Sequence, residues 1–164
     1  MHHKNNGMEI AILGIGAVRQ RFIELGMEEY SKRLKRYIPV KYEWLKDVKD
    51  AGRIPVERQK ELEGELILSK IQPSDYVVIL DERGKNFTSR EFSAWIEKRL
   101  GSGRKRMVLI IGGPYGFSQK VYDRKDEMIS LSKMTFSHEM VRLFLIEQIY
   151  RAMTILNGEP YHHD

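Results

Sequence analysis

The 164-residue sequence contains no cysteine. Disulfide bonds and thiolate-bound metal clusters are therefore excluded, and the chain is compatible with a reducing cytosol. We expect a cytoplasmic location. Without covalent staples the fold depends on its apolar core, and at this length folding buries roughly 68–70% of the surface that the open chain exposes. One globular domain is the natural expectation.

Long apolar runs are also missing. The longest are YVVIL at 76–80 and MVLII at 107–111, far short of the ~20 residues that span a bilayer, so we expect no membrane span. The opening MHHKNNG lacks the apolar stretch of a secretory signal. We expect residues 1–7 to be a flexible leader and residues 8–164 to form a single domain.

Apolar strand-like runs alternate with amphipathic segments from Met8 onward, without internal repeats or low-complexity tracts. The pattern predicts strands at 8–16, 40–45, 76–80, 107–111 and 128–132. A helix is predicted after each strand, and the string TSRE gives Thr88 and Glu91 the spacing of a capping box. This order predicts an α/β domain with a mainly parallel sheet flanked by helices.

In such sheets, ligands bind beyond the carboxyl ends of the strands. The third predicted strand ends at Leu80, and the fourth ends at Gly112 and Gly113. The fifth continues into Leu131, Ser132, Lys133, Met134, Thr135 and Phe136. These positions are the candidate binding residues.

Two motifs lie at these strand ends. The glycines of IGGPYG at 111–116 let the backbone pass close to a ligand, although a plain turn would also explain them. LSKMTF at 131–136 is an unusual polar, non-helical stretch before an apolar helix, and a loop followed by a Ser137 cap would also explain it. Neither motif alone establishes a binding site.

GIGAVR at 14–19 resembles a dinucleotide-binding string but has arginine in place of the third glycine. No acidic residue lies at the expected ~20-residue distance. The string therefore gives little support to a nucleotide-dependent enzyme. Histidine spacing that suits a metal ion is absent too, so we expect no metal site.

The basic excess is modest, with 28 Lys and Arg against 23 Asp and Glu and a formal net charge of +5. It favours a polyanionic partner without identifying one. The clusters at 98–106 and 32–36 are interpreted as a solvated turn and a solvated helix face. Arg19, Arg21 and Arg142 follow strand ends and are candidates for phosphate contacts.

His138 and Arg142 are four positions apart on the predicted last helix and share a face near its start. From the residues alone, an ordinary surface or core role for each is the simpler interpretation.

Five elements occur in order within residues 111–162 and together resemble one family, and the match covers nearly all of residues 8–162. They are IGGPYG, SLSKMTF, HEMVR, EQIYRA and the terminal PYH. This set resembles the RlmH family, the ribosomal RNA large-subunit methyltransferases of the SPOUT class. The resemblance implies a homodimer with a deep C-terminal trefoil knot that binds S-adenosylmethionine. It also implies methylation of ring nitrogen 3 of a pseudouridine in large-subunit (23S) ribosomal RNA, on the assembled ribosome.

Carried over position by position, the resemblance assigns two sets of residues. The implied cofactor contacts are Leu80, Gly112, Gly113, Leu131, Ser132, Lys133, Met134, Thr135 and Phe136. The implied substrate-handling, catalytic residues are His138, Arg142, Arg151, Tyr161 and His162, with the tail supplied by the other subunit. We hypothesise that His138 or His162 accepts the imide proton while Arg142 stabilises the developing oxyanion.

Two other functions compete with this one. A nucleotide-dependent oxidoreductase would use GIGAVR together with IGGPYG on an open parallel sheet. A non-enzymatic ribosome-associated module would rely on its basic surface alone and would bind in a salt-sensitive manner.

Overall fold

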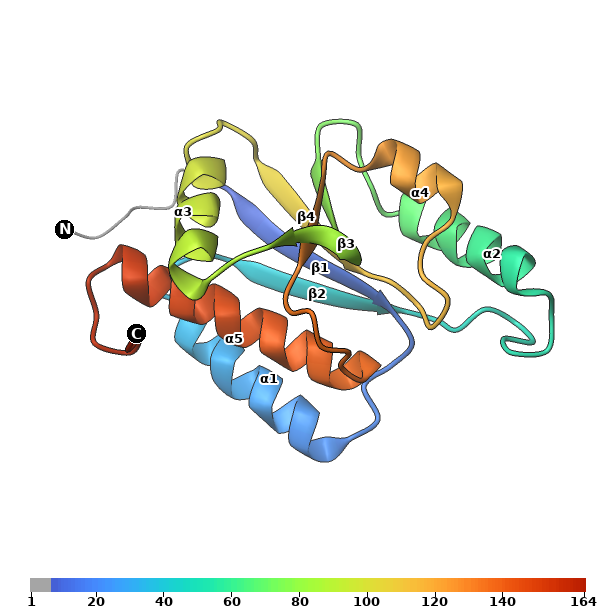
Figure 1. The fold of residues 1–164 in the computed structure, drawn as a ribbon, viewed down its shortest axis with the longest axis horizontal. Helices are drawn as coiled ribbons and strands as arrows, with labels where there is room; N and C mark the ends of the chain where they lie inside the picture. Colours follow the sequence, from blue (N-terminus) through green and yellow to red (C-terminus); the bar gives the residue numbers. More distant parts are fainter. Residues whose placement is uncertain (1–6) are drawn as a thin grey trace.

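A computed structural model describes residues 7–164, in which five strands alternate with five helices (Figure 1). The strands are β1 (Glu9–Ile15), β2 (Val40–Leu45), β3 (Tyr76–Asn86), β4 (Arg106–Ile111) and β5 (Glu127–Ser130). The helices are α1 (Arg21–Leu34), α2 (Val56–Leu68), α3 (Ser89–Leu100), α4 (Gln119–Arg124) and α5 (His138–Leu156). The predicted alternation of strands and helices is confirmed.

The five strands form one sheet in the order β2-β1-β4-β3-β5, and every neighbouring pair is parallel. Because the strands are parallel, their carboxyl ends lie along one edge of the sheet. This arrangement confirms the predicted α/β class and gathers the loops after β3, β4 and β5 at that edge.

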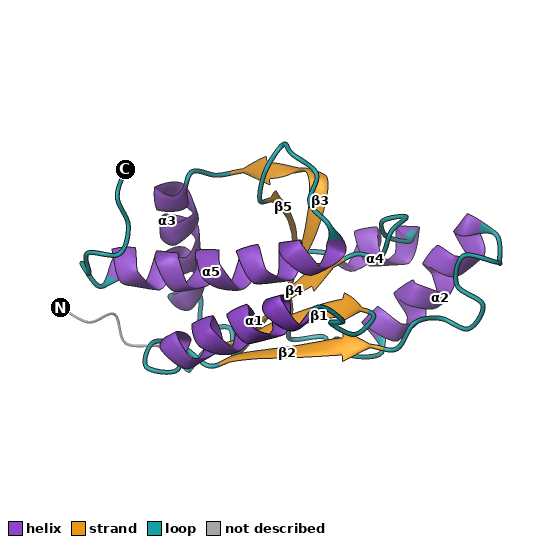
Figure 2. Ribbon diagram, turned by 90° about the horizontal axis from the view of Figure 1, so that it is seen from below, coloured by secondary structure: helices purple, strands orange, loops and turns teal. Residues whose placement is uncertain are grey.

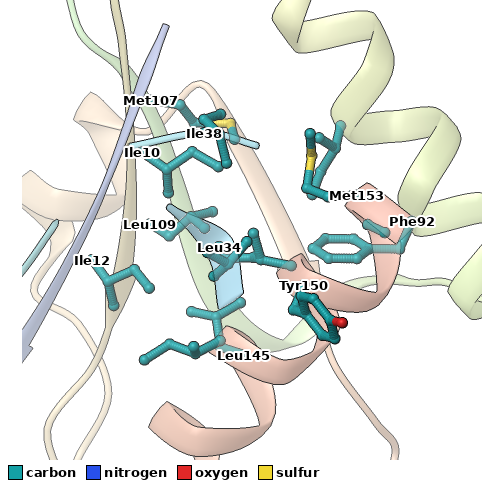
Figure 3. Packing of buried hydrophobic residues seen from close by; sticks show 14 of the residues in the cluster. Ile10, Ile12, Leu34, Ile38, Phe92, Met107, Leu109, Leu145, Tyr150 and Met153 are labelled. Carbon is teal, nitrogen blue, oxygen red and sulfur yellow. The ribbon is translucent and has the colours of Figure 1, made fainter. Parts of the chain in front are cut away.

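Alternate side chains of each inner strand enter two separate cores. Ile10 and Ile12 of β1 pack with α1, α3 and α5, and Figure 3 shows them in one cluster with Leu109, Leu145 and Tyr150. The intervening β1 residues face the opposite way and pack with α2 and α4. Because these strands are buried on both faces, their sequences are continuous apolar runs.

The helices fall into corresponding groups. α5 packs against both α1 and α3, whereas α2 packs against α4. Figure 2 shows α2 and α4 at one end of the molecule, and the C-terminal tail beside α3 at the other. No helix within residues 7–164 is long and apolar enough to cross a bilayer.

Strand β3 is longer than the sequence predicts. It was expected to end at Leu80, but it continues to Asn86 because it pairs with β5 twice. Leu80 and Lys85 are both in register with Ile129, so the residues between them bulge out of the ladder. Gly84 makes this possible, because a Cβ there would lie 2.5–2.7 Å from the backbone of Ile129.

Two helix starts follow their predicted caps. The Thr88 hydroxyl accepts from the Glu91 amide at 3.1 Å, and the Glu91 carboxylate accepts from the Thr88 amide at 3.3 Å. The Ser137 hydroxyl accepts from the Met140 amide at 3.4 Å and caps α5. The Ser137 cap fixes where the polar stretch after β5 ends and where the last helix begins.

Candidate functional site

A cleft of about 720 Å³ lies at the carboxyl ends of β3, β4 and β5. It is lined by residues 80–83, 111–117 and 130–138, together with Tyr122 and Val141. All the predicted cofactor residues line it, namely Leu80, Gly112, Gly113, Leu131, Ser132, Lys133, Met134, Thr135 and Phe136. Three segments that are far apart in the sequence therefore converge where the topology of the sheet predicts a ligand.

The first wall is the glycine loop, residues 112–116. A Cβ at Gly112 would lie 3.1 Å from the Phe117 ring, and one at Gly113 would lie 2.6 Å from Oε1 of Glu63. The amide of Gly116, which has a φ of 83°, donates to the Gly113 carbonyl at 3.2 Å. The glycines thus let the loop pack closely against the protein behind it while its backbone lines the cleft.

The second wall is the polar stretch of residues 131–136, which is bent and non-helical, and serine hydroxyl groups bond to its backbone. The Ser130 hydroxyl donates to the Ser132 carbonyl at 2.9 Å. The Met134 amide donates to the Ser132 hydroxyl at 3.0 Å. Such local bonds compete with helix formation. The Met134 side chain is left 76% exposed at the cleft.

The third wall carries an ion pair that sequence reasoning missed. Asp81 accepts a short hydrogen bond from the Tyr122 hydroxyl and further bonds from the Arg83 amide at 2.9 Å and the Arg83 Nε at 3.2 Å. Burial raises the pKa of Asp81, but the bonds from Tyr122 and Arg83 outweigh it and hold that pKa below its ordinary value. Asp81 is thus an ionised carboxylate with a cation beside it.

His138 and Arg142 do not share the cleft. His138 is the first residue of α5 and lines the cleft. Arg142 is only 2% exposed and donates from Nη1 to the Gly16 carbonyl at 2.8 Å and from Nη2 to the Ile15 carbonyl at 2.7 Å. Its guanidinium lies 4.2 Å from the centre of the Trp44 ring. The structure therefore places Arg142 at the carboxyl end of β1, away from the cleft lining.

Glu139, like Arg142, forms hydrogen bonds with the segment that follows β1. Its Oε1 accepts from the Arg19 amide at 2.6 Å and the Gln20 amide at 3.0 Å. The bond from Gln20 is the largest influence on the pKa of Glu139, which is held below its ordinary value. The first turn of α5 thereby holds the backbone at Arg19 and next to Arg21. The exposed side chains of these two arginines pair with Asp47 and Glu24 respectively, and phosphate contacts remain a prediction for them.

The remaining predicted residues form a tail cluster, which we define as Glu147, Arg151, Tyr161 and His162. Arg151 donates to Glu147 at 2.6 Å and contacts Nδ1 of His162 at 3.1 Å. The Tyr161 hydroxyl donates to the same Glu147 oxygen at 3.0 Å. Burial is the largest cause of the raised pKa of Tyr161, followed by its hydrogen bonds with Tyr30 and Glu147. The structure thus brings Arg151, Tyr161 and His162 together.

The tail cluster is far from the cleft within one chain. His138 begins α5, and Arg151 lies 13 positions later on the same helix. At 1.5 Å per residue this separation is about 20 Å. Figure 1 shows α5 running along the molecule, with the tail at the end opposite its first turn.

Sequence reasoning also missed a buried acid behind the glycine loop. Glu63 is 3% exposed, and burial raises its pKa. The signal was the spacing of Gln59, Glu63 and Ile67, which places all three on the buried face of α2. Because Gln59 and Glu63 are polar, this buried face does not show the apolar periodicity that normally marks one. Within residues 7–164, no group of three metal-ligating side chains is suitably placed for a metal ion.

Comparisons with known proteins agree on one family. Residues 8–162 match a family model described as "Predicted SPOUT methyltransferase". A protein of Parabacteroides distasonis is 53% identical over 157 residues, covering 96% of this chain and 100% of its own. One of Bacteroides fragilis is 51% identical over 157 residues, with the same coverage. Both relatives are named "Ribosomal RNA large subunit methyltransferase H".

One solved structure shows the same fold at low sequence identity. The crystal structure of the tRNA (m1G37) methyltransferase from Aquifex aeolicus superimposes with a TM-score of 0.51 at 16% identity. The match covers 95% of this chain and 75% of that one. At this identity the likeness bears on the fold alone.

Proposed function

The chain belongs to the SPOUT methyltransferase family, and from this premise we propose that it transfers a methyl group from S-adenosylmethionine to large-subunit ribosomal RNA. The family predicted from the motifs is confirmed. The observation that carries the proposal is the convergence of the residues after β3, β4 and β5 on one cleft. In keeping with the family, we also infer that the C-terminal region forms a trefoil knot.

The cleft suits S-adenosylmethionine in size and chemistry. Its volume of about 720 Å³ lies within the range of roughly 300–1,000 Å³ that is usual for small-molecule sites. Its lining combines glycine backbone, apolar side chains such as Leu80 and Phe136, and polar groups such as Ser132. We propose that the glycine loop, Leu80 and residues 131–136 hold the cofactor.

The main task of the protein in this reaction is to position the methyl donor and the target base. When bound, the cofactor supplies a methyl group on a sulfonium, which is already an activated electrophile. The chain must align that group with its target and exclude competing water. We propose ring nitrogen 3 of a pseudouridine as the target, which holds a proton that must leave. We propose that His138 of the cleft, or His162 of the tail, accepts it.

Arg142 has a different role in this proposal from the one that the motif implied. Both of its Nη atoms donate to backbone carbonyls, so a contact with a substrate oxyanion would require it to give up those bonds. Together with Glu139 it anchors the segment that carries Arg19 and Arg21. In this proposal Arg142 is thus a positioning residue for the segment that carries Arg19 and Arg21.

We propose that the active unit is a homodimer. Arg151, Tyr161 and His162 lie about 20 Å along α5 from His138, so in a dimer they would act at the cleft of the second copy. Apolar side chains are exposed on the neighbouring helices α1 and α5, where Phe22 is 60% exposed and Leu25 and Phe144 are also exposed. A second copy of the chain would cover such a face.

The assembled ribosome is the proposed substrate. A net charge of +5 is small for a protein that must find one base by electrostatics alone. Recognition of the shape of a folded particle would supply the missing specificity. Arg19 and Arg21, held by α5, are the proposed phosphate contacts.

The test is to incubate the protein and labelled S-adenosylmethionine with ribosomes that lack the modification, and then to locate the methyl group by mass spectrometry. We expect one labelled pseudouridine in the large-subunit RNA. Label on protein, on the small subunit or nowhere would contradict the proposal. Salt-sensitive ribosome binding without any methyl transfer would instead support the non-enzymatic module.

The oxidoreductase alternative makes a separate prediction, namely saturable binding of a nicotinamide or flavin. It required GIGAVR and IGGPYG to act together. None of the residues at 14–19 lines the cleft, whereas the whole of IGGPYG does. The cleft therefore does not unite the two motifs on which that alternative was based.

A further inference from the structure

A buried carboxyl group lies directly behind the glycine loop. A Cβ at Gly113 would lie 2.6 Å from Oε1 and 2.8 Å from Oε2 of Glu63, so the carboxyl group occupies the space behind that residue. Gly113 itself lines the cleft. One glycine residue therefore separates this carboxyl group from the proposed cofactor site.

The carboxyl group of Glu63 lacks a neutralising partner. Gln59 Nε2 donates to Oε2 at 3.3 Å, and Oε1 has no hydrogen-bond partner within the described part of the chain. Burial is the largest cause of its raised pKa, and the charged group that acts on it is another acid, Asp47. An ionised Glu63 would thus be a buried negative charge that favours a cation nearby.

The other charged groups around it are engaged elsewhere or exposed. On α4, which packs against α2, Asp123 accepts from Gln119, Arg124 pairs with Asp126, Tyr122 donates to Asp81, and Lys120 is exposed. On the cleft side, Asp81 is paired with Arg83. Of the acids beside the glycine loop and on β3, Asp81 is compensated by Arg83, Glu82 is exposed, and Glu63 is buried without a compensating cation among the described residues.

Methyl transfer changes the charge of the cofactor. The donor carries a sulfonium cation, and loss of the methyl group to the RNA nitrogen leaves a neutral thioether, with the sulfur retaining the electron pair of the broken bond. We propose that ionised Glu63 is a specificity-determining residue that makes the cleft prefer the cationic donor over its demethylated product. This inference rests on the proposed function. The preference would let the product leave after each transfer.

The proposal predicts a proton linkage with a definite sign. A cation in the cleft stabilises the ionised form of Glu63, so donor binding lowers its pKa and releases protons when Glu63 is partly protonated. Product binding lacks this effect. The preference for the donor is therefore greatest above the pKa of Glu63 and declines as the pH falls through it.

The experiment measures the dissociation constants of S-adenosylmethionine and S-adenosylhomocysteine by calorimetry on the whole protein between about pH 5 and pH 7. The α-amino groups of both ligands stay protonated there, because such groups titrate near ~8. The proteins are the wild type, Glu63→Gln, and the matched control Glu61→Gln on the exposed face of α2. His138 also lines the cleft, but it is common to all three.

We expect Glu63→Gln to lower the ratio of product to donor dissociation constants by about tenfold, the effect of one charge roughly 10 Å away at an effective dielectric constant of ~20. The ratio should also lose its pH dependence, whereas Glu61→Gln should match the wild type. Proton release on donor binding to the wild type, measured in buffers of different ionisation enthalpy, tests the linkage without any variant.

Two results would overturn the inference. One is an unchanged ratio in Glu63→Gln, whether both affinities are retained or both fall equally, and an equal fall would indicate a merely structural role. The other is donor binding without proton release across the whole range. If neither ligand binds the wild type, the cofactor assignment itself fails, and this outcome is distinct from binding of both ligands at an unchanged ratio.

Discussion

Arg142 places a positive charge inside the fold. Burial is the largest influence on its pKa and lowers it, while the carboxylates of Glu139 and Asp47 act in the opposite direction. Two carbonyls and the face of Trp44 compensate for the lost water, although Nε has no partner among the described residues. A planar guanidinium fits this site because it donates in two directions while it stacks on the indole ring.

We therefore predict that Arg142→Lys destabilises the protein by about 1–3 kcal/mol, because lysine keeps the charge but cannot make both carbonyl bonds and the stacking contact. Urea denaturation followed by circular dichroism measures the change. Arg58→Lys is the control, since Arg58 forms an exposed pair with Glu61, and such pairs contribute little. Equal midpoints for the two variants would show that the buried contacts are not specific to arginine.

The spacing of His138 and Arg142 shows the limit of prediction at the level of residues. Four positions on a helix do place two side chains near one face. The same spacing does not reveal that His138 lines the cleft while Arg142 binds carbonyls at the carboxyl end of β1. That difference depends on where Trp44 and those carbonyls lie. Those groups belong to distant parts of the chain and become neighbours of Arg142 only on folding.

At the level of elements, strand β3 illustrates what periodicity misses. The apolar run at 76–80 marked its first half, because those residues are buried between two helical layers. The second half, DERGKN, is polar and resembles a loop. It is a strand because β5 lies beside it, and a bulge at residues 81–84 restores the register. Capping signals, by contrast, depend on neighbouring residues and were predicted correctly at Thr88 and Ser137.

Gly84 is the residue on which this second pairing depends. We predict that Gly84→Ala destabilises the protein by about 3 kcal/mol, because its Cβ would collide with backbone atoms of Ile129, which cannot rotate away. The change should also lower cofactor affinity, since the bulge and β5 both lead into the cleft walls. Thermal unfolding and calorimetry with S-adenosylmethionine measure the two effects.

Gly101→Ala is the matched control. A Cβ at Gly101 would meet its neighbours at 3.7 and 3.8 Å, which is ordinary contact. This variant should therefore unfold and bind like the wild type. If Gly84→Ala behaves in the same way, the double pairing of β3 with β5 is not a constraint on the fold.

At the level of the whole molecule, the cleft at the strand ends was predictable and the complete proposed site was not. Parallel strands bring their carboxyl ends to one edge, so marking where three predicted strands end was enough to select Leu80, the glycine loop and residues 131–136. The tail cluster obeys no such rule. In the proposed homodimer, its position relative to a cleft depends on how the two copies meet, and the pattern of a single sequence does not predict that contact.

The proposed homodimer makes a prediction that mixed dimers can test. A protein truncated before Tyr161 keeps every cleft residue, so it should bind S-adenosylmethionine but fail to methylate ribosomes. A full-length Thr135→Trp variant, with a bulky side chain in its cleft, should keep its tail but bind no cofactor. Mixed dimers of the two should regain activity, because one intact cleft then meets one intact tail. Full activity of the truncated homodimer, or inactive mixed dimers, would show that each chain works alone.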